Sequence, residues 1–179
     1  NEKFYNKRRK CLYDVLGDSK IRPNQLFSLS LSYQVVDPGS EIALNILDVV
    51  TKKLLNKYGL KTLAKNEENY VEIYEGNSVK RDMSYHQGIT WPWLLGLYNN
   101  AFENVIKNTK LKTKKQELQD KYNEFVQDVK NTFITELENG KTVGSISELY
   151  DSKKPFESKG AFAQAWSVAE VFRIILKNL

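Results

Sequence analysis

The chain alternates between charged amphipathic segments and more apolar segments, and this alternation restricts its fold more than any single motif does. Both kinds of segment repeat apolar residues at helical spacing, so both are expected to be helices. The expected outer, charged helices are roughly residues 2–12, 40–58 and 113–138, and the expected inner, apolar helices are roughly residues 23–35, 91–107 and 161–177. The sequence therefore predicts an all-α fold of three outer and inner pairs.

Loops of one polarity are expected to meet at one end of this fold. Each expected outer helix is followed by a loop and then by an inner helix, and in a ring of such pairs these loops share one rim. The longest of them, roughly residues 59–90, exceeds what compact connections need, and such loops are commonly functional. We therefore expect a single site on this rim.

Length and composition exclude several classes of protein. At 179 residues and 20.7 kDa the chain can bury one core and shows no linker, so residues 1–179 are treated as one unit. A mean hydropathy of -0.53 without a long apolar run excludes a membrane span and predicts a soluble, cytoplasmic chain. With one cysteine, Cys11, and one histidine, neither a metal nor a cofactor is expected.

Positive charge raises the question of nucleic acid binding, since the net charge is +5 and the pI is about 9.1. The lysines are spread over Lys52-Lys53, Lys107 to Lys115 and Lys153-Lys154, and they do not form one stripe with aromatic side chains between them. This pattern is typical of solvated helix faces, so no nucleic acid partner is expected. A basic binding module is kept only as an alternative.

The segment from Arg81 to Trp93 combines an arginine beside an aspartate, the only histidine and two tryptophans. Burying a core does not require this mixture. Aromatic faces with a few polar groups suit a concave pocket for a ligand that has flat apolar patches and many hydroxyls, such as a sugar. The segment therefore indicates a carbohydrate-binding site.

Read as RD-x-x-YHQG-x-x-WPW, this segment resembles a signature of the α-1,6-glucosidase part of glycogen debranching enzymes. Further stretches resemble motifs of that family in the family's order: Leu12-Tyr13-Asp14 with Ile21-Arg22-Pro23-Asn24-Gln25, Gly59-Leu60-Lys61-Thr62-Leu63, Ser147-Glu148-Leu149-Tyr150-Asp151 and Ala163-Gln164-Ala165-Trp166-Ser167. The resemblance covers almost the whole chain. Ile89-Thr90 and Phe162-Ala163 depart from the pattern of relatives and could retune the pocket.

The resemblance implies the C-terminal half of an (α/α)6 toroid, the glucoamylase-like six-hairpin barrel. Because Asn1 falls within an expected helix pattern, we expect the chain to be the C-terminal part of a longer catalytic domain. The missing N-terminal half of the toroid is then an expected partner, since it would cover the inner helices. Self-association is expected without it. The implied substrate is glycogen or a branched maltooligosaccharide.

Glycoside hydrolysis normally needs two carboxyl groups, one to protonate the leaving oxygen and one to activate water or attack the sugar. The resemblance implies that Glu148 is the general base of an inverting enzyme, while a surface glutamate near a helix end is the alternative. Arg81 favours the charged form of Asp82, which suits an acceptor of sugar hydroxyls better than a proton donor. The resemblance places the acid before Asn1, so the chain alone is expected to be inactive.

Other motif residues are candidate sugar-binding groups. The polar candidates are His86, Gln87, Gln164, Arg22, Asn24 and Gln25. His86 could bind a hydroxyl or only brace its loop. Arg22 is expected to hold the Tyr13-Asp14 loop by a salt bridge, so that Asn24 or Gln25 reaches the site, although these two could also be ordinary helix caps.

Aromatic rings are expected to form the sugar platform. Trp91 and Trp93 are two positions apart at an expected helix start, so their rings should diverge by about 200° and one should face the core. Trp166 is the third tryptophan, and Tyr150 follows Glu148 within its motif. At least one of the three indole rings is expected to stack on a sugar.

Two other classes of function stay open. One is another toroid chemistry, such as a trehalase-like hydrolase, another α-glucosidase or a phosphorolytic enzyme. Phosphorolysis needs clustered basic residues or a glycine-rich turn, and only Arg81 is near the motif, so hydrolysis is favoured. The other is a non-catalytic carbohydrate-binding fragment, which would need the tryptophans but not Glu148.

Overall fold

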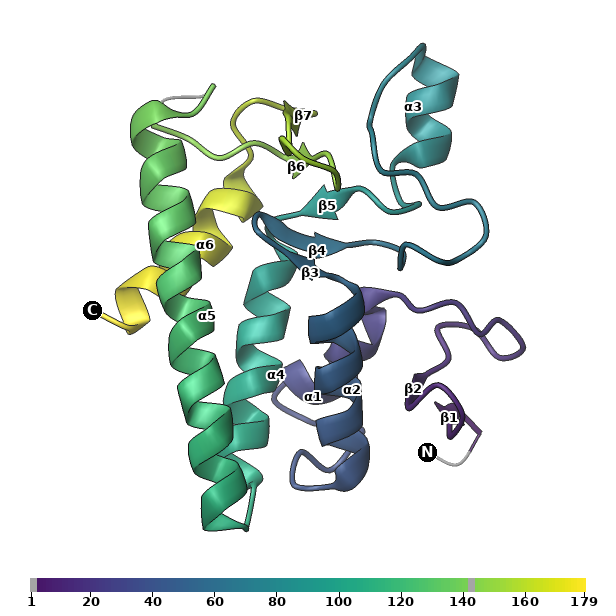
Figure 1. Ribbon diagram of the computed structural model, residues 1–179, viewed down its shortest axis with the longest axis vertical. Coiled ribbons are helices and arrows are strands. Elements are labelled where there is room, and N and C mark those ends of the chain that lie inside the picture. Colours follow the sequence, from purple (N-terminus) through teal and green to yellow (C-terminus); the bar gives the residue numbers. More distant parts are fainter. Residues whose placement is uncertain (1–2, 142–143) are drawn as a thin grey trace.

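The computed structural model describes residues 3–141 and 144–179, which contain six α-helices, one 3-10 helix and two antiparallel sheets (Figure 1). The helices are η1 (Pro23–Leu26), α1 (Phe27–Ser30), α2 (Glu41–Lys53), α3 (Ser78–Ser84), α4 (Leu94–Asn108), α5 (Lys112–Asn139) and α6 (Ala165–Lys177). Helices α2, α4, α5 and α6 confirm four of the expected helices. None of the helices in these ranges has the length and apolar composition that crossing a bilayer requires.

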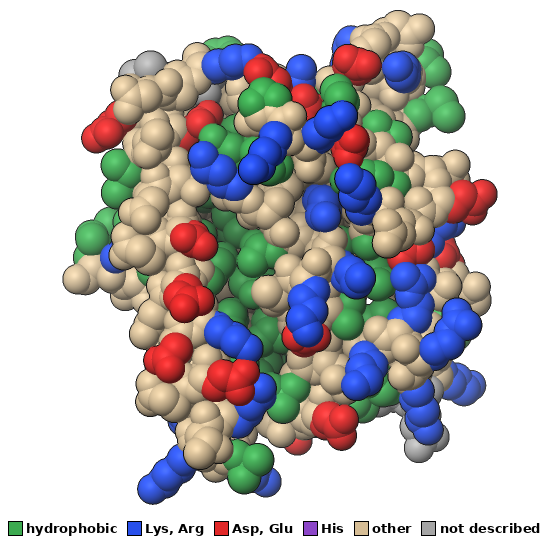
Figure 2. All heavy atoms as spheres, in the orientation of Figure 1, with side chains coloured by type: hydrophobic (Ala, Val, Ile, Leu, Met, Phe, Trp, Pro, Cys, Tyr) green, Lys and Arg blue, Asp and Glu red, His purple; other side chains and the backbone are tan. Residues whose placement is uncertain are grey.

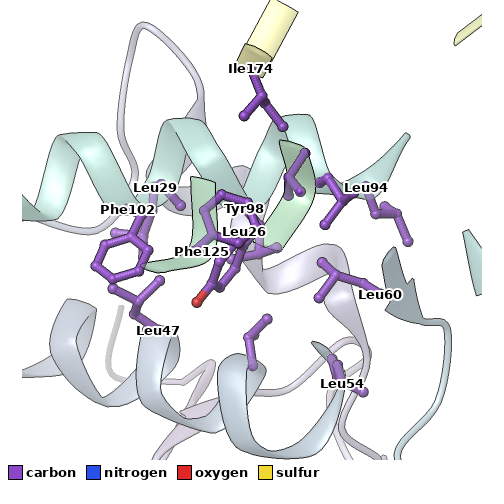
Figure 3. Packing of buried hydrophobic residues seen from close by; sticks show 14 of the residues in the cluster. Leu26, Leu29, Leu47, Leu54, Leu60, Leu94, Tyr98, Phe102, Phe125 and Ile174 are labelled. Carbon is purple, nitrogen blue, oxygen red and sulfur yellow. The ribbon is translucent and has the colours of Figure 1, made fainter. Parts of the chain in front are cut away.

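Helix α4 is the central helix and packs against α1, α2, α5 and α6. Its residues Leu95, Tyr98 and Phe102 are at most 3 % exposed. The Tyr98 ring makes edge contacts with Phe102 and with Phe125 of α5, at centroid distances of 5.6 and 4.9 Å. Figure 3 shows these rings among leucines of the neighbouring helices. Burial of each large apolar side chain stabilises the fold by about 1.5–3 kcal/mol, so this cluster holds the helices together.

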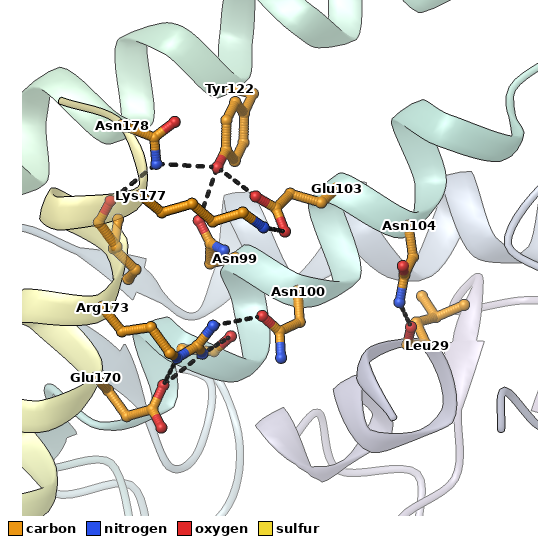
Figure 4. A network of polar contacts seen from close by, with 12 residues as sticks. Leu29, Asn99, Asn100, Glu103, Asn104, Tyr122, Glu170, Arg173, Lys177 and Asn178 are labelled. Atoms are coloured by element: carbon orange, nitrogen blue, oxygen red, sulfur yellow. Dashed lines mark hydrogen bonds and ion pairs between the residues drawn. The ribbon is translucent and has the colours of Figure 1, made fainter. Parts of the chain in front are cut away.

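Polar contacts fix α6 across α4 (Figure 4). The Arg173 guanidinium donates to the Asn100 side chain at 2.8 Å and to the Gly96 carbonyl oxygen at 3.2 Å. A Cβ atom at position 96 would collide with the side chains of Glu170 and Arg173. Glycine at this position therefore allows α6 to approach α4 closely.

A five-stranded antiparallel sheet shows that the all-α expectation is wrong in part. Its strands, in spatial order, are β3 (Leu55–Asn56), β4 (Gly59–Lys61), β5 (Thr90–Trp91), β6 (Leu149–Tyr150) and β7 (Ser158–Lys159). Each strand has only two or three residues, which is too short for side-chain alternation to reveal it in the sequence. The sheet lies at one end of α2 and α4 and brings the motif segments together (Figure 1).

The first expected helix, residues 2–12, is also wrong. Residue 2 lies outside the described residues, and the remainder forms a hairpin of β1 (Tyr5–Asn6) and β2 (Cys11–Leu12). Lys10 has a φ of 55° and donates its N–H to the Asn6 carbonyl oxygen at 2.8 Å, which closes the turn. Arg9 in this turn pairs with Glu67 at 2.5 Å and donates to the Ser19 carbonyl oxygen at 2.7 Å, so long-range contacts hold the hairpin in place.

All three expected inner helices have different bounds, and the third, α6, begins at Ala165 instead of at residue 161. Of residues 23–35, only Pro23 to Ser30 are helical, because Leu31 is extended and the N–H groups of residues 35 and 36 turn back to the Ser28 carbonyl oxygen. Helix α4 begins at Leu94, three residues later than expected, because residues 90–91 pair in the sheet. The sheet therefore sets the start of the central helix.

A hollow of about 610 Å³ lies between α2 and α5 (Figure 2). Its floor is apolar and includes Leu44, Leu55 and Phe125, whereas Glu124 and Asp128 of α5 lie on its rim. None of the residues expected to bind sugar lines it.

The central position of α4 leads to a first prediction. Leu95→Ala should lower the free energy of unfolding by about 2–5 kcal/mol, because it leaves a cavity where the side chain is 1 % exposed. Urea unfolding followed by circular dichroism measures this change. Leu111→Ala is the control, since Leu111 is 72 % exposed and its truncation should change stability by less than about 0.5 kcal/mol. Equal effects of the two substitutions would contradict this account of the core.

Candidate functional site

Glu148 lies directly before β6, and three donors surround its carboxylate. Oε1 accepts a short hydrogen bond from the Tyr85 hydroxyl, and the Gln164 amide nitrogen lies 3.5 Å from the same oxygen. Oε2 accepts from the backbone N–H of Ala161 at 2.9 Å. The backbone N–H of Glu148 in turn donates to the Ala161 carbonyl oxygen at 2.9 Å. Glu148 is therefore half-buried and held between two segments, and it is not a free surface glutamate.

Tyr85 is a site residue that the sequence reasoning missed. It caps α3, and its ring makes edge contacts with Trp91 at 4.7 Å and with His86 at 4.9 Å between centroids. Burial, and then the bond to the Glu148 carboxylate, raise the pKa of Tyr85 well above its ordinary value. The hydroxyl therefore stays protonated and remains a donor. The position of Tyr85 within the RD-x-x-YHQG motif was the feature of the sequence that could have identified it as a site residue.

The three tryptophans and His86 form one aromatic group. His86 stacks on Trp91 at 5.4 Å, Trp91 meets the edge of Trp166 at 5.9 Å, and Trp93 stacks on Trp166 at 5.3 Å. Trp166 is 45 % exposed, whereas Trp91 is only 3 % exposed. The exposed rings of this group can therefore receive the flat face of a ligand.

The helical angle expected between Trp91 and Trp93 does not apply, because Trp91 is in strand β5 and Trp93 precedes the first residue of α4. Both residues line the same hollow of about 170 Å³. The expectation that one of the two faces the core is confirmed, since Trp91 is part of the hydrophobic core.

Arg22 connects two of the motif loops. Its guanidinium donates to the carbonyl oxygens of Thr62 and His86, at 3.2 and 2.8 Å, and to the Gln87 side-chain oxygen at 3.0 Å. The expected salt bridge to the Tyr13-Asp14 loop is wrong, since the Asp14 carboxylate instead accepts from the Asn24 amide at 2.9 Å. Arg22 does not turn to Asp14 because the carbonyl oxygens of Thr62 and His86 already accept hydrogen bonds from its planar guanidinium group.

The small hollow next to these residues is where a ligand would fit. It is lined by Arg22, Pro23, Asn24, Thr62, His86, Trp91, Trp93 and Leu94. Burial, and then the nearby Arg22 charge, lower the pKa of His86, while Asp82 opposes this shift. The imidazole is therefore neutral at pH 7 and offers both a donor and an acceptor.

Two expected binding residues are structural instead. Gln25 is 6 % exposed, and its side chain accepts from the Leu12 N–H at 3.2 Å and donates to the Arg22 carbonyl oxygen at 2.9 Å. Tyr150 is 1 % exposed and donates to Glu136 at 3.1 Å. Both polar groups already have buried partners, so the structure does not present them to a ligand.

Arg81 and Asp82 lie exposed on α3, at the edge of this region. The Arg81 guanidinium donates to the Gly76 carbonyl oxygen at 2.5 Å. Asp82 acts on His86 through its charge. Within residues 3–141 and 144–179, no three His, Cys, Asp or Glu side chains are grouped so that they could hold a metal ion.

A comparison with known families agrees with the arrangement of these motifs. The model of the amylo-alpha-1,6-glucosidase family matches residues 1–173. The chain belongs to this family. It is thus a glycosidase domain related to glycogen debranching enzymes, and the family implies glycogen or a branched glucan as the substrate. The motif residues that meet around Glu148 and Trp166 lie within the matched range.

The single histidine allows a direct test of the site's electrostatics. The pKa of His86, followed by NMR, should lie below its ordinary value, and Arg22→Met should raise it because a neighbouring positive charge is lost. Asp82→Asn should lower the pKa of His86 further, because a neighbouring negative charge is lost. Folding favours the neutral imidazole of His86. The stability that this preference contributes is therefore present above the ordinary pKa of histidine, and it is lost as pH falls through the pKa of His86 in the folded protein.

Arg8→Met is the matched control for this titration, because Arg8 is exposed in the β1–β2 hairpin turn. It should leave the His86 pKa unchanged. An unchanged pKa in Arg22→Met would show that Arg22 does not act on the imidazole.

Proposed function

We propose that this chain supplies the general base, Glu148, of an inverting amylo-α-1,6-glucosidase that removes α-1,6-linked glucose from glycogen or a branched α-glucan. The observation that carries the proposal is the position of the Glu148 carboxylate. It lies where two motif loops meet, bonded to Tyr85, whose ring packs against Trp91. A carboxylate held beside an aromatic group suits a base that works next to a bound sugar.

In the proposed reaction, a water molecule attacks the anomeric carbon of the terminal glucose. Glu148 takes a proton from this water while the bond to the leaving oxygen breaks, and a carboxylic acid on the other side protonates that oxygen. An inverting enzyme needs its two carboxyl groups about 6.5–9.5 Å apart to leave room for the water.

The aromatic group is the proposed platform for the sugar. Trp166 is the most accessible of its rings, and Trp93 stacks on it. Gln164 begins α6 next to Glu148, and His86 lies across the aromatic group. Amide and imidazole groups there can bind the vicinal hydroxyls of glucose. The further proposed hydroxyl partners are Gln87, Asn24, Arg22, Arg81 and Asp82.

The proposed acid is an aspartate outside residues 1–179, in the N-terminal half of an (α/α)6 toroid. The packing of the helices supports this, since α4 contacts both α1 and α6, as a middle inner helix would, and also contacts α2 and α5. Exposed apolar residues on α1 and α6, namely Phe27, Phe172 and Leu176, are surfaces that the other half would cover. Alone, the chain would self-associate through them. A cytoplasmic location stays a prediction.

Replacement of the proposed base is the main test. In the full-length enzyme that contains this chain, Glu148→Gln should lower kcat for release of α-1,6-linked glucose by about 10²–10⁴, with KM changing little. Glutamine keeps the size of the side chain but cannot take the proton. Glu138→Gln, at an exposed position of α5, is the control and should leave kcat unchanged. Near-normal kcat in Glu148→Gln would reassign the base to another carboxylate.

The chain by itself should not hydrolyse a short α-1,6-branched maltooligosaccharide at a useful rate. It lacks the proposed acid, and half a toroid leaves the charged groups of the site open to water. The assay compares the purified chain with the full-length enzyme and with the Glu148→Gln chain. Activity within about tenfold of full length, lost in the Glu148→Gln chain, would place the acid inside this chain, and Asp82 would be tested first.

A trehalase-like or other toroid α-glucosidase would show its preference for another linkage in the same assay. A non-catalytic carbohydrate-binding role would leave full-length activity insensitive to Glu148→Gln. The two alternatives are thus separated from the proposal by substrate preference and by the Glu148 variant.

A further inference from the structure

The two oxygens of the Glu148 carboxylate have different partners. Oε1 faces two side-chain donors, the Tyr85 hydroxyl and the Gln164 amide, whereas Oε2 receives one backbone N–H, from Ala161. Each carboxylate oxygen has two lone pairs. The described donors thus fill the acceptor capacity of Oε1 and leave one position on Oε2.

Ring contacts on several sides hold Tyr85 where its hydroxyl donates to this carboxylate. Its ring lies between Trp91, His86 and Tyr74, with centroid distances of 4.7, 4.9 and 5.8 Å. Its carbonyl oxygen accepts the Trp91 indole N–H at 3.2 Å, which fixes the backbone as well. A donor that is fixed before the reaction stabilises the charged carboxylate without reorganisation.

Glycine at position 160 leaves space next to Oε2 of Glu148. Gly160 has a φ of +71°, and a Cβ atom there would collide with Glu148 Oε2. A glycine is therefore required by the backbone conformation and by the space next to this oxygen.

We propose that Tyr85 is a positioning residue that, with Gln164, occupies Oε1 of Glu148 and so makes Oε2 the oxygen that takes the proton from the attacking water. This inference rests on the proposed function of Glu148. The water oxygen bonds to the anomeric carbon, its proton moves to Oε2, and the leaving oxygen departs with the bonding pair and takes a proton from the carboxylic acid. Tyr85 keeps its own proton throughout.

The other groups near Glu148 come from two segments. On the α3 side the titratable neighbours are Tyr85, Tyr74 and His86, and His86 in turn faces Arg22 and Asp82. On the side of the 158–164 segment, Ala161 and Gln164 contribute neutral donors. The cation of that segment, Lys159, pairs with Asp151 at 3.7 Å.

The pH profile of the full-length enzyme tests the inference. Tyr85→Phe removes a hydrogen bond to the proposed base, and a hydrogen bond to the charged form of a carboxyl favours that form. The acidic limb of kcat/KM should therefore move up by about one pH unit. A purely structural role of Tyr85 would lower activity without moving this limb. An acidic limb identical to that of the wild type would overturn the inference.

Tyr74→Phe is the matched control, because it removes a hydroxyl from the neighbouring ring that is not among the described donors to Glu148. Tyr74→Phe should leave the acidic limb of kcat/KM at the same pH as in the wild type. Equal shifts in both variants would also overturn the inference. If Tyr85→Phe fails to fold, site-specific 3-fluorotyrosine at position 85 gives the same test with opposite sign, since a more acidic phenol should move the limb down.

A second variant tests the choice of oxygen. Gly160→Ala places a methyl group against Oε2 and should lower kcat at least tenfold across the pH range, and the positive φ at this position should also lower the melting temperature. Near-normal kcat would show that Oε2 is not the acceptor. Failure of the whole proposed function would instead appear as full activity in Glu148→Gln. If Glu148→Gln loses activity but Tyr85→Phe leaves the acidic limb of kcat/KM unchanged, only the positioning role of Tyr85 is ruled out.

Discussion

Five short antiparallel strands connect the loops of this protein, and the site depends on that pairing. The backbone hydrogen bonds of β4, β5 and β6 fix segments from three distant parts of the chain in one register, for example Thr90 opposite Tyr150. An ion pair between Lys153, after β6, and Glu72, between β4 and β5, joins two of these segments at 3.6 Å. Arg22 adds to this by bonding carbonyl oxygens of two loops that the sheet has already brought near. The helices supply the core on which the sheet rests.

Within the site, hydrophobic contact and hydrogen bonding act on the same residues. Tyr85 packs its ring against Trp91 and donates its hydroxyl to Glu148, so one side chain couples the aromatic group to the carboxylate. Arg22 lowers the pKa of His86 and also holds its backbone. The proposed base and the proposed sugar platform are therefore parts of one packed unit.

The sequence allowed the long helices to be predicted because each carries a continuous apolar stripe, as in α5, where buried residues recur every three or four positions. The strands could not be predicted, since each is too short to show a period and the pairings of β4 with β5 and of β5 with β6 join distant parts of the chain. The family was readable from the motifs, and the match over residues 1–173 confirms it. Roles within the motifs were less readable. Tyr150 and Tyr85 are both motif tyrosines near Glu148, yet only the folded chain shows that one bonds buried Glu136 and the other bonds Glu148, 63 positions away.

The close approach of α6 to α4 at Gly96 has a consequence for how the protein can vary. Trp166 is in the first turn of α6, and Glu170 and Arg173, whose side chains lie against Gly96, follow on the same face of that helix. A side chain at position 96 would push the Glu170 and Arg173 side chains aside and so change the contact of α6 with α4. A change at a residue outside the aromatic group would then alter the proposed sugar platform, and random mutagenesis screened for binding would find it among apparent specificity variants. The fit between two helices is thus part of what positions the proposed platform.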